Sequence, residues 1–95
     1  MFQLAHFLLE GALPYPVEQL DTQAEMIAVD QLLLAGQLLQ LAICEEENRW
    51  WAIVTAKTAW EAEQLVAQIP FVNHDVKVRE LSFFACNEIQ GFSPN

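Results

Sequence analysis

Basic residues are scarce in this sequence. Four lysines and arginines stand against 13 aspartates and glutamates, which gives a formal net charge of −9 at pH 7. A chain this acidic repels the phosphates of nucleic acids and the anionic surface of membranes, and no basic stripe offsets the repulsion. We therefore expect neither nucleic acid nor a membrane among its partners.

Glycine and cysteine are also rare. With three glycines, the chain holds no GxGxxG fingerprint, P-loop or nucleophile elbow. Cys44 and Cys86 lack CxxC spacing, so we interpret them as free thiols, with a disulfide or a metal pair as the alternative.

Long hydrophobic runs are missing as well. Polar residues interrupt every apolar run well short of the roughly 18 residues that a membrane-spanning helix needs. The first residues lack the basic lead-in that is typical of a secretory signal. A cytoplasmic location is therefore the expectation.

Apolar residues, by contrast, are abundant. Hydrophobic residues make up 54% of the 95 positions, and three of them are Trp and six are Phe. This length predicts a single domain that spans residues 1–95, and the more polar stretch 86–95 forms its tail. Because one small domain cannot easily hide so much apolar surface, we expect the chain to associate with itself.

The apolar patterns and turn residues predict six elements in the order βαββαβ. Capping boxes mark two helix starts, at Thr22 with Glu25 and at Thr58 with Glu61. Gly36 ends the first helix, and Pro70 ends the second. The predicted strands span residues 2–10, 37–44, 49–56 and 75–85.

Each helix has a predicted buried stripe. Met26, Val29 and Leu33 repeat at helical spacing in the first helix and are expected to face the core. The second helix has the clearer stripe, at spacing i, i+3, i+4, i+7. Its members are Ala62, Leu65, Val66 and Ile69.

Two interlocked βαβ-type crossovers give an α+β fold, the ferredoxin-like βαββαβ plait. It has a four-stranded antiparallel sheet with both helices on one face, so the other face is bare. The neighbouring Trp50 and Trp51 place one ring on each face. We expect a second copy to cover the bare face, in a homodimer of two sheets packed back to back.

The order and spacing of several motifs resemble the muconolactone isomerases. These motifs are Glu25 with Gly36, the segment EAEQLVAQIPF at 61–71 and the segment VKVREL at 76–81, and the family's members have about this length, so the resemblance covers the chain nearly end to end. The resemblance implies a dimeric α+β barrel, with larger rings of dimers as a further expectation. It also implies that the protein shifts a proton within a small unsaturated lactone, without a cofactor or a metal.

This chemistry needs a general base close to a carbon acid in a largely apolar cavity. Glu25 matches the family's first-helix glutamate by its distance from Gly36, and His6 and His74 are the other candidate catalytic residues. Each has a structural alternative: Glu25 as a capping residue, His6 as a core histidine, and His74 as a residue that only opens the last strand.

The chain departs from the family on the second strand, where Leu41, Ala42 and Ile43 stand in place of Arg and Trp. Two functions stay open. The first is a muconolactone delta-isomerase-like proton transfer on a small lactone or a related cyclic acid. The alternative is a non-catalytic dimeric module that binds a small hydrophobic ligand. A haem-degrading monooxygenase on the same barrel is a weaker third, because neither histidine has a recognisable ligand context.

Overall fold

The computed structural model describes residues 3–20, 22–73, 75–83 and 85. Predictions that concern His74, Phe84, Cys86 and the 86–95 tail lie outside these residues. The elements follow the predicted order. They are β1 (Ala5–Ala12), the short 3-10 helix η1 (Val17–Gln19), α1 (Thr22–Leu34), β2 (Leu38–Cys44), β3 (Arg49–Ala56), α2 (Ala59–Val66) and β4 (Lys77–Leu81).

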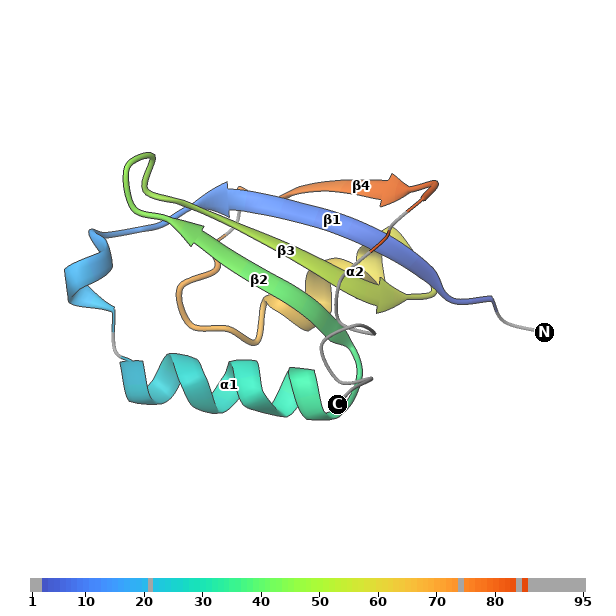
Figure 1. Cartoon of the computed structure of the whole chain (residues 1–95), viewed down its shortest axis with the longest axis horizontal. Coiled ribbons are helices and arrows are strands. Elements are labelled where there is room, and N and C mark those ends of the chain that lie inside the picture. The colour runs from blue at the N-terminus through green and yellow to red at the C-terminus, as the bar shows by residue number, and fades with distance from the viewer. Residues whose placement is uncertain (1–2, 21, 74, 84, 86–95) are drawn as a thin grey trace.

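The four strands form one antiparallel sheet in the order β2-β3-β1-β4 (Figure 1). The central strand β1 pairs along its whole length with β3, from Ala5 opposite Ala56 to Ala12 opposite Arg49. On its other side β1 pairs with β4. In Figure 1, α2 lies behind the strands and α1 runs along the β2 side. This open sheet with two helices is compatible with the predicted ferredoxin-like plait.

The two faces of the sheet differ, because successive side chains point to opposite sides. Phe7 and Leu9 of β1 and Val54 of β3 are buried under the helices. The residues between them are half-buried on the other side, which we call the open face. The open face consists of His6, Leu8 and Glu10 from β1, Arg49, Trp51, Ile53 and Thr55 from β3, Lys77, Arg79 and Leu81 from β4, and Gln40, Ala42 and Cys44 from β2.

The second helix begins as predicted. The Glu61 amide donates to Thr58 Oγ1 at 3.0 Å, and the Lys57 amide donates to the Glu61 carboxylate at 2.7 Å. The predicted stripe is buried, Ile69 included. However, α2 ends at Val66, one turn before the predicted end at Pro70. The Ile69 amide bonds to the Val66 carbonyl, three residues back, so the chain leaves the helix through tight turns before it reaches Pro70.

The first helix ends as predicted, at Gly36. This glycine has φ +75°, and the Gln37 amide donates to the Leu32 carbonyl at 3.0 Å. The Gly36 amide donates to the Leu33 carbonyl, which completes a Schellman motif. At the other end, the predicted N-cap Thr22 is the first helical residue, and its side chain lies outside the described part of the chain.

The predicted core face of α1 is wrong in two of its three residues. Val29 is buried, but Met26 is 46% exposed and Leu33 is 44% exposed. Glu25 and Leu32 occupy the buried positions instead. Apolar residues lie on both sides of α1, so hydrophobic spacing alone does not select the face that meets the sheet.

Trp50 fixes the packing between β1 and β3. Its side chain is fully buried, and its ring lies 6.1 Å from the ring of Phe71. A Cβ atom placed on Gly11 would come within 3.0 Å of Trp50 Cζ2 and Nε1. Gly11 therefore lies in the interior of a strand because only a residue without a side chain leaves room for the indole.

In the described part of the chain, neither helix combines the length and the apolar character that a membrane span requires.

Gly11→Ala is expected to destabilise the protein by about 1–3 kcal/mol, because the added methyl overpacks a fully buried ring. Urea denaturation measures the change. In a Trp50→Phe background the same substitution should cost clearly less, because phenylalanine lacks the indole atoms nearest to Gly11. Equal losses in the two backgrounds would contradict this explanation.

Candidate functional site

Glu25 is the only buried polar side chain among the described residues, with 5% of its surface exposed. It lies on the inner side of α1, one turn before Val29 and two turns before Leu32. An isolated carboxylate in such a place loses its hydration, so it requires hydrogen bonds from the protein.

Two donors supply these bonds. The Phe71 amide donates to Glu25 Oε1 at 3.2 Å, and the Tyr15 hydroxyl donates to Oε2 at 3.3 Å. Phe71 follows α2, and Tyr15 precedes α1. The carboxylate therefore connects α1 to the loop before it and to the turn after α2, 46 residues away, which is a structural role regardless of any chemistry.

Glu25 also lines a small cavity of about 100 Å³ between α1 and β2. All other lining residues in the described part of the chain are apolar, so the carboxylate is the one ionisable group that these residues place on the wall. A carboxylate in an apolar cavity is suited to remove a proton from a bound carbon acid. The apolar lining consists of Leu20, Met26, Val29, Leu41, Ile43 and Phe71.

Positive charge is lacking around this cavity. None of its lining residues is basic. Arg49, Lys77 and Arg79 belong to the open face, on the other side of the sheet, and Lys57 lies between β3 and α2. An anionic ligand in the cavity would have no counter-charge there and would face the Glu25 carboxylate.

His6, the second candidate residue, does not lie beside Glu25. It lies on the open face, opposite Thr55 on β3 and Leu81 on β4, so the sheet separates it from Glu25. The position of His74 lies outside the described residues. Among the described residues, the partners of the Glu25 carboxylate are Tyr15 and Phe71, and His6 is not one of them.

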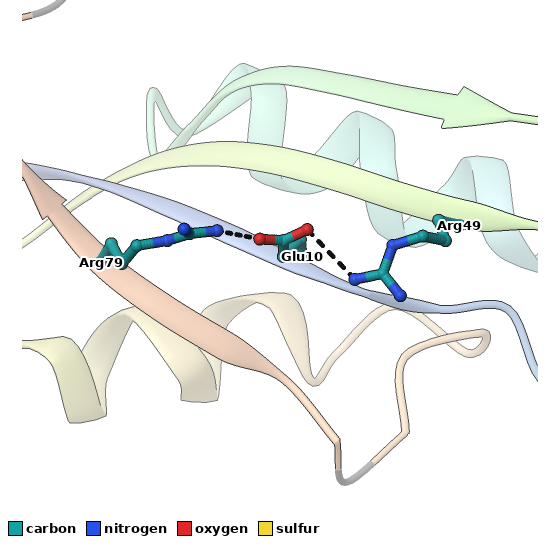
Figure 2. A network of polar contacts seen from close by, with 3 residues as sticks. All are labelled: Glu10, Arg49 and Arg79. Carbon is teal, nitrogen blue, oxygen red and sulfur yellow. Dashed lines mark hydrogen bonds and ion pairs between the residues drawn. The ribbon is translucent and has the colours of Figure 1, made fainter. Parts of the chain in front are cut away.

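Sequence reasoning did not single out Glu10, which organises a second polar cluster (Figure 2). Figure 2 shows its carboxylate between the guanidinium groups of Arg49 and Arg79. The distance to Arg49 Nη2 is 3.1 Å, and the other carboxylate oxygen bonds to Arg79. Lys77 lies directly opposite Glu10 on β4. A lone acid within the apolar strand β1 was the available sequence signal.

The rest of the open face is mostly apolar. Arg49 lies over the ring of Trp51, with 6.0 Å from Cζ to the ring centroid. Beside Trp51 a shallow hollow of about 70 Å³ reaches Leu8 and Ile53. Three of the four basic residues of the chain thus border an apolar surface on this face.

Metal-ligating residues do not gather in the described ranges, where no group of three or more His, Cys, Asp or Glu side chains converges. Cys44, at the end of β2, is a free thiol, as predicted.

Comparison of the chain with protein-family models, with curated proteins and with solved structures finds no match. The similarity to muconolactone isomerases therefore stays a prediction from sequence motifs, and the geometry of the Glu25 cavity carries the functional argument.

Glu25→Leu is expected to destabilise the protein by about 1–3 kcal/mol, because the buried Phe71 amide loses its acceptor. Glu25→Gln keeps a carbonyl oxygen at this position and should cost less than half as much. Chemical denaturation of both variants measures the difference. Equal stability of the leucine variant and the wild type would show that the amide does not depend on Glu25.

Proposed function

We propose that this protein catalyses a cofactor-independent proton transfer on a small, uncharged ring compound, such as an unsaturated lactone, with Glu25 as the base. One observation carries the proposal: among the described residues, a buried carboxylate is the only ionisable group on the wall of an apolar cavity. The motif resemblance to muconolactone isomerases points to the same reaction class.

The chemistry follows from the groups around the cavity. The Glu25 carboxylate takes a proton from a ring carbon next to a carbonyl, the C–H bond breaks, and its electron pair enters the conjugated enolate. The carboxylic acid then returns the proton to another carbon of that system, so the double bond moves and nothing is consumed. Tyr15 and Phe71 hold the two carboxylate oxygens in place for both steps.

Size and charge define the substrate class. A cavity of about 100 Å³ is small compared with the roughly 150 Å³ site that holds benzene in an engineered protein, so it suits a five- or six-membered ring at most. Because no lining residue is basic, the proposal is for an uncharged ring rather than the carboxylate-bearing lactone of the family's namesake.

The second candidate is a non-catalytic module that binds a small apolar ligand. It is favoured by the fact that both oxygens of Glu25 already accept hydrogen bonds from the protein. In that case Glu25 only positions α1, and the cavity takes a ligand without reaction.

Two assays distinguish the two candidate functions. They measure turnover and binding of the uncharged α-angelica lactone, with muconolactone for comparison. We expect ultraviolet absorbance to report isomerisation of the uncharged lactone, and Glu25→Gln to reduce kcat by at least about 100-fold, the scale of lost general-base catalysis. Tyr15→Phe keeps the base but removes one of the two hydrogen bonds that hold it, so it should lower kcat by less than Glu25→Gln does. If the wild type binds the lactone without turnover, the module is correct and the enzyme is not.

We also propose that two copies pack through their open faces, as in a dimeric α+β barrel. The apolar residues Leu8, Trp51 and Ile53 on this face support the proposal, since a second sheet would remove them from water. The Glu10 cluster lies at one end of this surface and reduces the positive charge that the two faces bring together.

Ile53→Lys is expected to abolish this contact, because it places a charge in the middle of the apolar surface. Trp60→Lys is the matched control, since Trp60 is 69% exposed on α2, away from the open face. Light scattering at micromolar concentration should give a lower mass for the first variant than for the second. The same mass for both variants would refute packing through the open face.

A further inference from the structure

The outer side of α1 presents a second apolar surface. Met26, Ile27, Leu33 and Leu34 are between 44% and 89% exposed, and Ile43 on the neighbouring β2 is 39% exposed. These five residues, which we call the α1 flank, account for most of the exposed large hydrophobic residues in the described part of the chain. Only Leu4, Trp60 and Phe83 lie elsewhere.

The α1 flank is one continuous surface. Met26 and Leu33 are seven residues apart, as are Ile27 and Leu34, so they form two neighbouring rows along the helix. Met26 and Ile43 both line the Glu25 cavity, which connects the helix rows to the strand. Since both residues are also partly exposed, the cavity opens to the surface within the α1 flank.

We propose that a second copy of the chain docks on the α1 flank, flank against flank, and closes the mouth of the Glu25 cavity. This contact is distinct from packing through the open face, so the two together would link copies into larger assemblies. The docking is inferred from the exposed residues alone. The claim that it closes a substrate cavity rests on the proposed function.

The charge distribution favours a second copy as the occupant. Two chains of net charge −9 repel each other, so they associate best through surfaces that carry little charge. Asp30 is the one charged residue that lies between the two rows of the flank. A single carboxylate among five apolar side chains offers little to a basic partner, whereas the apolar rows are complementary to themselves across a two-fold axis.

The available area is sufficient. The exposed parts of the five residues and their neighbours on two copies amount to on the order of 1,000 Å², close to the smallest area that a specific protein interface buries. Each copy contributes about half of this area, which is the size, roughly 300–600 Å², of the largest apolar patch on a typical monomer, and such a patch is often functional.

Leu34→Lys tests the contact, with Trp60→Lys as the matched control, because both change a highly exposed apolar residue on a helix to lysine. Light scattering should show half the wild-type mass, or less, for Leu34→Lys and no change for the control. An Ile53→Lys variant should still dimerise through the α1 flank, and the double variant Ile53→Lys/Leu34→Lys should be a monomer. The same mass for Leu34→Lys and the control would overturn the proposal, whatever the fate of the open-face contact.

Asp30→Asn identifies the occupant. If two copies meet flank to flank, the substitution removes a pair of like charges and should lower the dissociation constant of self-association several-fold. Weaker or unchanged self-association would overturn the proposal, because the two Asp30 carboxylates would then not face each other. Closure of the cavity has its own readout: Leu34→Lys should raise KM for α-angelica lactone, while the control should not. If the wild type shows no turnover at all, the proposed function fails and the mass results still decide the contact.

Discussion

The hydrogen bond from the Phe71 amide to Glu25 joins the two halves of the helical layer. α2 packs on β3, β4 and β1, whereas α1 contacts the sheet mainly at β2. The helices therefore share little surface, and the buried carboxylate connects the first to the turn that follows the second. Its position also creates the cavity, because the same turn contributes the ring of Phe71 to the wall. The stability of the protein and the proposed chemistry thus both depend on the Glu25 side chain. For this reason the Glu25→Gln and Glu25→Leu variants must be compared.

Charge is divided between the two sides of the sheet. The helix side holds the Glu25 carboxylate, whose hydrogen-bond donors are uncharged, and the open face holds three of the four basic residues around Glu10. None of these three basic residues lines the cavity. The proposed substrate class therefore depends on the location of the arginines as much as on the cavity itself.

The sequence predicted the order of the strands, the helix ends at Thr58 and Gly36 and the opposite directions of Trp50 and Trp51 well, because turn chemistry and strand alternation are local. Two strand bounds were wrong, since β1 continues through Gly11 to Ala12 and β4 covers only Lys77–Leu81 of the predicted 75–85. The sequence predicted the core face of α1 poorly, since apolar residues surround that helix. Glu25 was a candidate from the motif resemblance, but its partner Phe71 lies 46 residues away, and no local pattern reports such a contact. The separation of His6 from Glu25 likewise depends on strand register and helix placement, which spacing does not determine.

The strand order has a consequence for how the chain folds. β1 is made first but lies between β3 and β4, so its partners extend to Ala56 and Leu81. Such distant pairings carry a large loop-closure entropy, and folding is slow when they dominate the contacts. The β2–β3 hairpin, closed by a four-residue turn at 45–48, contains the most local strand pairing of the sheet. During synthesis the apolar β1 therefore has no partner strand until β3, Arg49–Ala56, has been made.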